Sequence, residues 1–436
     1  MSAQPVKQQQ SLKPFLALWV GQVFSLLGSQ LVQFALIWWL TQQTGSATVL
    51  AVASIVGLVP QVVLGPFVGP LVDRWNRKWT MILADTVVAL ATLVLAILFW
   101  VGQADIWHVY VILFVRALGS TFHNPAMTAS TSLMVPQEHL TRVQGLNQML
   151  NGGLNIISAP LGALLLQLLP LQGVLMIDMV TAAVAITTVL LIRVPQPRHE
   201  AGATGSAVGQ YWHDLRAGFR YVLGWRGLLI LMGMATLINL VLSPSTSFIP
   251  LLVTEHFQGT AWHLGAMEAA LGIGVLVGGV LLGAWGGFKN RIYTSLVGLI
   301  GLGFSVLFLG LVPVSLFPLA VLAMGLMGLM SSITNGPIMA VLQAAVAPSM
   351  QGRVFTLLSS AAMAMMPLGL AVAGPLADVI GVRTWFLIGG LLTLALGIGG
   401  QFIPALVNLE KDRDDHLERE PPMAQITQME SSSQSV

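Results

Sequence analysis

Residues 124–143, NPAMTASTSLMVPQEHLTRV, return in altered form as residues 335–354, NGPIMAVLQAAVAPSMQGRV. Both stretches contain an Asn shortly before a proline, then a second proline and an Arg-Val pair. The prolines recur 212 residues later and the Arg-Val pair 211 residues later. A third proline, Pro160 in the first stretch of chain and Pro367 in the second, precedes Leu-Gly in both places. The chain is therefore predicted to be one unit of about 200 residues built twice, an organisation that many secondary transporters share.

The composition indicates a membrane protein. Of the 436 residues, 55% are hydrophobic and only 8% are charged, and the mean hydropathy is +0.81. Soluble domains carry about 25% charged residues, so this chain has too little polar surface to stay dissolved in water. The sequence contains no cysteine, which excludes disulfides, thiolate metal sites and a Cys nucleophile.

Apolar runs long enough to cross a bilayer, about 20 residues each, recur along the whole chain. The first run is longer than the core of a signal peptide, so we expect it to remain in the mature protein. The pattern predicts an all-α membrane protein with twelve transmembrane helices in two pseudo-repeated six-helix bundles. The predicted spans are 15–41, 47–72, 79–101, 107–131, 142–169, 171–193, 227–253, 262–287, 291–312, 316–345, 352–378 and 383–408.

The basic residues support this division and orient it. Of the 19 Lys and Arg residues, 17 fall on one side of the predicted spans. The positive-inside rule then predicts that the N- and C-termini are cytoplasmic. The predicted units are a cytoplasmic N-terminal segment (1–14), a first bundle (15–193), a cytoplasmic linker (194–226), a second bundle (227–408) and a disordered cytoplasmic tail (409–436).

Apolar side chains recur at helical spacing in the second part of the linker. This spacing favours an amphipathic helix on the membrane surface, and an extension of the seventh span is an equal alternative. The residues are Trp212, Leu215, Phe219 and Val222.

The segment between the second and third spans carries a recognisable motif. Residues 69–78 run GPLVDRWNRK. They resemble the signature loop of the major facilitator superfamily, which has Gly, three residues, Asp-Arg, one residue, Gly-Arg and a base. Asn76 stands where the family has its second Gly, and Asn tolerates a left-handed backbone better than most residues.

The resemblance implies that this loop is a gate. The carboxylate of Asp73 would meet the N-terminus of the eleventh span near Gly352, where the helix carries a partial positive charge. The bases of the motif would pair with nearby acids and anionic lipid heads, or would only enforce the topology. The residues of the gating motif are Gly69, Asp73, Arg74, Arg77 and Lys78.

Within the superfamily, the chain is similar to the macrolide-efflux and siderophore-exporter branch. Residues 25–38, SLLGSQLVQFALIW, and residues 335–343 and 348–355 carry this similarity. It implies a multi-pass protein of the inner or plasma membrane that exports lipophilic or amphipathic small molecules by proton antiport, with alternating access. A siderophore or other metabolite exporter, a solute importer, and a non-transporting sensor or lipid scramblase remain as alternatives.

Arg116 lies about nine residues into the fourth span, or about 14 Å, near the middle of a core of about 30 Å. A guanidinium there costs at least about 2.5–3.5 kcal/mol unless it faces water or a partner, so it is predicted to point inward. Drug antiporters of the superfamily carry an Arg at the comparable place that is tied to proton coupling. A structural buried ion pair is the alternative.

Acidic residues also fall inside apolar spans, where any of them can change protonation during transport. Glu268 is the preferred proton or cation site because nothing basic flanks it in the sequence. Asp85 and Asp178 are further candidates. For Asp85 the anchoring of a helix end is the more typical role, and it is also placed to pair with a loop arginine. Asp378, near the outer end of the eleventh span, is more typical of a residue that anchors a helix end.

Polar side chains share one face on four of the predicted spans. Such faces avoid lipid, so they meet either protein or a watery cavity. In the superfamily the first, fourth, seventh and tenth helices line the central cavity, and interhelical hydrogen bonding is the alternative role. The predicted cavity residues are Gln22, Ser25, Ser29, Gln33, Ser120, His123, Asn124, Asn239, Ser243, Thr246 and Asn335.

Several motifs are missing from the sequence. There is no Walker loop, no cluster with metal-ligand spacing and no Gly-x-Ser-x-Gly elbow. The chain is therefore predicted not to be an enzyme, with no catalytic residue, no metal and no cofactor. The expected partners are a small-molecule substrate, protons and membrane lipids, without nucleic acid, and the expected state is a monomer.

Overall fold

The computed structural model describes residues 12–196 and 207–410. Every regular element over these residues is helical, and twelve helices are long and apolar enough to cross a membrane. The all-α fold with twelve spans is thus confirmed, and the cytoplasmic location of the termini stays a prediction. Most of the predicted N-terminal segment, part of the linker and nearly all of the predicted tail lie outside the described residues.

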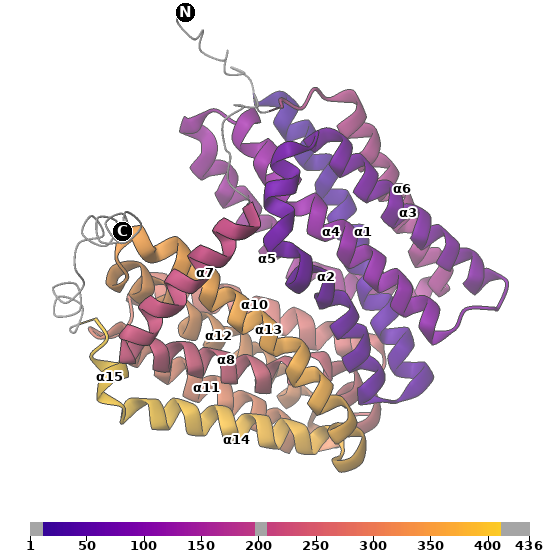
Figure 1. The fold of residues 1–436 in the computed structure, drawn as a ribbon. Helices are drawn as coiled ribbons and strands as arrows, with labels where there is room; N and C mark the ends of the chain where they lie inside the picture. The colour runs from indigo at the N-terminus through magenta and orange to yellow at the C-terminus, as the bar shows by residue number, and fades with distance from the viewer. Residues whose placement is uncertain (1–11, 197–206, 411–436) are drawn as a thin grey trace, which may run out of the picture.

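The first half of the chain forms six long helices (Figure 1, indigo to magenta). Pro125 and Pro160 lie inside the fourth and fifth of them, as the sequence predicted. The helices are α1 (Lys13–Thr44), α2 (Ala47–Arg74), α3 (Arg77–Trp100), α4 (Ile106–Met134), α5 (Leu140–Leu168) and α6 (Leu171–Leu191), with the short turn η1 (Gln137–His139) before α5.

The second half repeats this order. Its helices differ most from the predicted spans at two of their ends. The seventh span ends at Ser247 and the twelfth at Gln401, earlier than predicted, because Pro250 and Pro404 start new short helices. The long helices are α8 (Arg226–Ser247), α10 (Ala261–Trp285), α11 (Arg291–Leu311), α12 (Phe317–Ala345), α13 (Pro348–Ile380) and α14 (Val382–Gln401). The short ones are α9 (Ile249–Leu251), η2 (Leu252–His256), η3 (Val314–Leu316) and α15 (Pro404–Val407).

The two bundles contact each other through two equivalent pairs of helices. In the first bundle α1 packs on α6, and α4 packs on α2 and α3; in the second, α12 packs on α10 and α11. Between the bundles, α2 packs on α13 and α5 packs on α10. The second helix of each half therefore contacts the fifth helix of the other. Figure 1 shows the bundles converging near the α1–α2 turn and the end of α13.

Asn76 begins α3 as a helix cap. Its backbone is extended, at φ −72° and ψ 105°, and its side chain accepts a hydrogen bond from Trp79 N at 3.3 Å. The tolerance of Asn for a left-handed backbone is therefore not used here, and helix capping explains the residue instead. Asn290 caps α11 in the same way, by accepting from Ile292 N at 3.0 Å. The motif loop thus keeps its capping chemistry in both halves.

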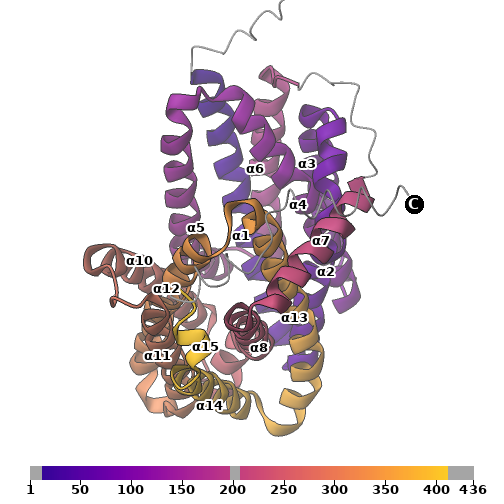
Figure 2. The same cartoon turned by 60° about the vertical axis from the view of Figure 1, so that its left-hand side comes forward.

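A separate helix, α7 (Ala207–Gly224), joins the two bundles. It is not an extension of α8, because Trp225 between them is extended, at φ −120° and ψ 99°. It packs on α13 and α8, and Gly218 lies so close to α13 that a Cβ there would be 3.0 Å from Arg353 O. Figure 2 shows α7 crossing from the first bundle to the second.

The close contact between α10 and α12 is testable at two adjacent glycines. A Cβ at Gly278 would lie 2.9 Å from Leu329 Cα, whereas a Cβ at Gly279 meets no atom within 4 Å. We expect Gly278→Ala to lower stability by about 1–3 kcal/mol through overpacking. Gly279→Ala should be neutral or stabilising, since Ala is the better helix former by about 1 kcal/mol. Thermal unfolding in detergent measures both, and equal melting temperatures would contradict the packing described.

Candidate functional site

A cavity of about 440 Å³ lies between the two bundles. Its walls come from α1, α2, α3 and α4 of the first bundle and from α8 and α13 of the second. Hydroxyl and amide groups dominate the polar part of the lining, with Arg116 as its charged member. The predicted cavity residues that line it are Ser29, Gln33, Ser120, Ser243 and Thr246.

The sequence did not predict that α2 contributes to the cavity. Ser54 and Gln61 both line the cavity, and they are two helical turns apart on one face. Ser54 Oγ also donates to Ser247 Oγ of α8 at 3.2 Å, which joins the bundles. The spacing of Ser54 and Gln61 was the pattern that could have revealed this fifth polar face.

The remaining predicted cavity residues lie elsewhere. Asn335 is exposed on α12, and its side chain donates to Ser331 O of its own helix at 2.9 Å. Asn239 likewise donates to Ala235 O at 2.9 Å. Such bonds to the preceding turn satisfy an amide without a ligand. The predicted residues outside the cavity lining are Gln22, Ser25, His123, Asn124, Asn239 and Asn335.

Arg116 and Asp178 form a buried ion pair. Arg116 Nη1 lies 2.6 Å from Asp178 Oδ2, and the two residues are 7% and 2% exposed. Nη1 also donates to Thr92 Oγ1 at 3.0 Å, and Nη2 donates to Ser29 O at 3.1 Å. One guanidinium thereby links α4 to α6, α3 and α1. The guanidinium points inward, and its partner is an acid that the sequence did not pair with it.

A second polar layer lies two turns from this ion pair. Asp85 Oδ1 is 3.5 Å from His123 Nε2, with Gln22 beside the carboxylate. Gln22, Asp85 and His123 each stand seven residues along their own helix from a residue that belongs to the Arg116–Asp178 network. That spacing is about 10 Å along a helix. The expectation that Asp85 pairs with a loop arginine is wrong, because α3 turns the carboxylate toward α4.

Glu268 lies at the contact between the bundles. It lines a small pocket of about 160 Å³ with Gln30 and Gln33 of α1 and with Asn155 and Ser158 of α5. Over the described part of the chain, no basic side chain pairs with Glu268. The buried Ser158 Oγ likewise lacks a hydrogen-bond partner there. The pocket is therefore polar on both sides of the bundle interface.

The motif bases anchor the start of α3. Arg77 is 7% exposed and donates from Nη1 to Ala129 O at 2.8 Å. Lys78 Nζ donates to Leu190 O and Ile192 O at the end of α6, where the helix dipole favours a cation. Arg74 is exposed. The side chain of Asp73 lies outside what the structure describes, so the proposed latch stays a prediction.

Two glycines on the motif side have no described neighbour in side-chain position. A Cβ built at Gly69, or at Gly352 near the start of α13, would meet no atom within 4 Å. Gly69 also has no positive φ in this structure. The two segments that the predicted latch would join therefore have free space around them.

The opposite side of the interface is closed by Asp378. Its Oδ2 accepts from Ser46 Oγ at 2.9 Å and from Thr48 N at 3.1 Å, and its Oδ1 accepts from Ala47 N at 2.6 Å. A carboxylate from the end of α13 thus caps the first turn of α2 in the other bundle. Gly374 permits this approach, because a Cβ there would lie 2.8 Å from a side chain of α2.

Glu255 of η2 stands beside this clamp. Burial, and then the charge of Asp378, raise the pKa of Glu255. A carboxyl group whose pKa is higher in the folded than in the unfolded protein stabilises the folded state at pH values below the unfolded pKa. This stabilisation is lost as the pH rises through the pKa of the folded state. Protonation of Glu255 is therefore expected to relieve its repulsion of the Asp378 carboxylate.

Two pseudo-repeated six-helix bundles around a polar cavity, built from apolar spanning helices, define a multi-pass transporter of the cell membrane. The Major Facilitator Superfamily model matches residues 18–370, and the chain belongs to this superfamily of transporters. Its substrate is accordingly a small molecule, and the prediction that the chain is not an enzyme is confirmed by the family.

Named relatives include efflux proteins. The chain is 36% identical to "Macrolide efflux protein A" of Streptococcus pyogenes over 88% of this chain and 94% of the relative. It is 27% identical to "Multidrug efflux pump Tap" of Mycolicibacterium fortuitum over 91% and 97%. A crystal structure of a bacterial homologue of the iron transporter ferroportin shares the fold, with TM-score 0.69, 15% identity and coverage of 90% and 99%.

The buried ion pair yields a stability prediction. Asp178→Asn should cost about 3–5 kcal/mol, because it leaves the Arg116 guanidinium buried without a counter-ion. The double variant Arg116→Met/Asp178→Leu should recover most of that loss. Glu410→Gln is the matched control, since it removes the partner of Arg291 in an exposed pair worth about 0–1 kcal/mol. Thermal unfolding tests this, and equal losses in all three variants would contradict it.

The Asp378 clamp yields an accessibility prediction. The chain has no cysteine, so Gln61→Cys places one label site in the central cavity. Adding Asp378→Ala should increase labelling by an impermeant maleimide applied on the side of the α1–α2 turn. Asp105→Ala removes a helix cap on the same side within one bundle, and should change nothing. Unchanged labelling with Asp378→Ala would show that the clamp does not close this side.

Proposed function

We propose that this protein exports lipophilic or amphipathic small molecules of the macrolide or drug type. The cavity between the bundles carries the proposal, because both halves line it and its hydroxyl and amide groups can bind varied ligands. Met366 adds a flexible apolar side chain to the same lining. The names of the relatives support this choice of cargo.

The distribution of basic residues predicts which side of the membrane the open side faces. If the positive-inside rule holds, both termini and the motif loop face the cytoplasm, and the free space at Gly69 and Gly352 faces the same way. The Asp378 clamp then closes the outer side. The bundles, residues 15–193 and 227–408, would rock about the cavity to expose it outward, with the Asp73 latch forming in that state. One chain supplies both bundles, so we propose a monomer as the working unit.

Glu268 is the proposed proton site. Its carboxylate stands at the α1–α5–α10 contact without a basic partner among the described residues, and helices at this contact must move past one another. Loss or gain of a proton there changes the cost of burying the group between the bundles. Arg116 is already paired with Asp178, so we propose that it positions the first bundle rather than exchanging protons.

Transport in inside-out vesicles tests export and coupling together. Energised vesicles that contain the protein should accumulate a radiolabelled macrolide, and a protonophore should abolish the accumulation. Glu268→Gln should reduce gradient-driven accumulation at least tenfold while leaving the folded fraction unchanged. Glu138→Gln is the matched control, because it neutralises an exposed carboxylate that lines neither the central cavity nor the pocket of Glu268.

The outcomes separate the alternatives. Accumulation that survives Glu268→Gln would refute the proposed proton site but not export. No accumulation across a broad panel of amphipathic compounds would refute export. Lipid movement that persists with a protonophore would instead indicate a scramblase, and ligand binding without flux would indicate a sensor.

A further inference from the structure

A second large cavity opens on the exposed surface of the first bundle. It is a groove of about 660 Å³ between α3 and α4, and the α2–α3 turn forms one end. No residue that lines this groove also lines the central cavity. Leu83 and Trp79 on its wall are 65% and 61% exposed, so the groove faces the membrane rather than the transport path.

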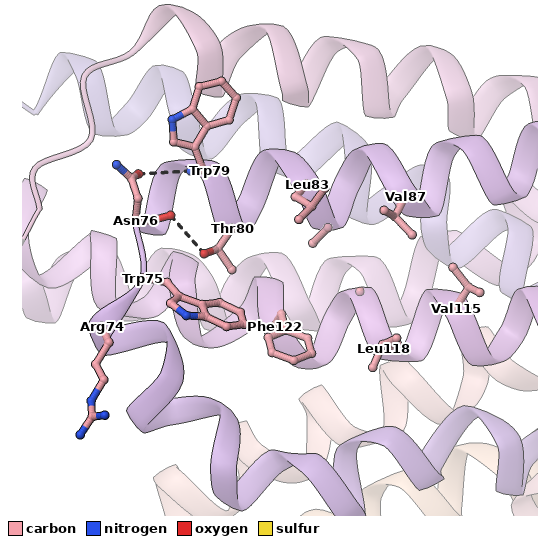
Figure 3. A pocket seen from close by; sticks show the side chains of 12 residues that line it. Arg74, Trp75, Asn76, Trp79, Thr80, Leu83, Val87, Val115, Leu118 and Phe122 are labelled. Atoms are coloured by element: carbon pink, nitrogen blue, oxygen red, sulfur yellow. Dashed lines mark hydrogen bonds between the residues drawn. The ribbon is translucent and has the colours of Figure 1, made fainter.

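The lining of the groove changes from apolar to polar along its length. Its long wall is apolar, with Leu83 and Val87 on α3 and Val115 and Leu118 on α4. From Trp79 to Val87 the wall extends about 12 Å at the rise of an α-helix, which suits the upper part of an acyl chain. Figure 3 shows these side chains as two pairs, one on each helix, that lead away from the polar end.

The polar end has the character of a membrane interface. Trp75 stacks on Phe122, with centroids 5.8 Å apart and an angle of 14° between the rings. Trp75 and Trp79 are both exposed, and exposed indoles gather at the level of lipid headgroups. Figure 3 places Trp75 against Phe122 at this end of the groove, with Arg74 beyond it and Trp79 at the start of α3.

Arg74 supplies the charge at this end. It is exposed, and no acidic side chain whose position is described pairs with it. The start of α3 lies beside it, and a helix N-terminus favours an anion. An anionic headgroup above an apolar chain therefore matches the groove at both ends. A cationic amphiphile does not, because Arg74 would repel its charge.

We propose that this groove is a binding site for one anionic glycerophospholipid. Its phosphate lies at Arg74 and the start of α3, its glycerol region lies between Trp75 and Trp79, and one acyl chain runs along Leu83 and Leu118. The site is separate from the central cavity, with which it shares no lining residue, and its headgroup end includes Arg74 of the gating motif.

Native mass spectrometry of the full-length protein tests the headgroup. The probe is phosphatidylglycerol, with phosphatidylcholine of the same chains for comparison. The intact protein should retain one phosphatidylglycerol at concentrations where phosphatidylcholine is lost. Arg74→Gln should weaken this retention at least tenfold, and Arg142→Gln, which removes another exposed cation, should not change it. Equal retention of both lipids, or equal losses in both variants, would overturn the proposal.

A groove-filling variant tests the location. Leu83→Trp should block the chain and abolish retention, whereas Leu90→Trp adds the same bulk on an exposed face of α3 outside the groove. Because both positions face lipid, both variants should fold, and size-exclusion chromatography checks this. Retention that persists in Leu83→Trp, or a cationic amphiphile that displaces phosphatidylglycerol from this site, would refute the assignment.

Discussion

A charge inside a bilayer needs a partner within the protein, and the Arg116–Asp178 ion pair is where this constraint acts most strongly. The guanidinium also donates to Thr92 and to Ser29, so four helices of the first bundle are tied to one group. The Asp85–His123 layer adds a second connection between α3 and α4. The first bundle is thereby held as a unit, which is what a rocking mechanism requires of it.

The second bundle is held together by a different means. Its helices approach closely at glycines, such as Gly278 against α12 and Gly390 against Leu307 of α11. Close backbone approach is a common way to pack helices in lipid, where the hydrophobic effect between them is absent. The contacts between the bundles include a carboxylate clamp, a pair of serines, the pocket of Glu268 and close approaches at Gly265 and Gly374. Two stiff bundles joined by such contacts can open the interface on one side while they close it on the other.

The sequence predicted the twelve spans, since hydropathy and the repeat are local properties. It also predicted that Arg116 points inward, but not that Asp178 is its partner, because the two are 62 positions apart and meet only after α4 and α6 pack. The same dependence on helix rotation explains why Asp85 meets His123 instead of a loop arginine. Asn335 satisfies its amide on its own helix, which no spacing rule distinguishes from a cavity-lining role.

We propose that the two bundles move as rigid bodies about the cavity. Because the chain has no cysteine, spin-label pairs can be placed on both sides. One pair, at Glu138 and Lys289, spans the bundles on the motif side, and a second, at Gln103 and Val314, spans them on the side of the Asp378 clamp. Pulsed dipolar spectroscopy at high and low pH, with and without a macrolide, should show one distance shortening as the other lengthens. Distances that stay fixed, or that change together in the same direction, would contradict the account.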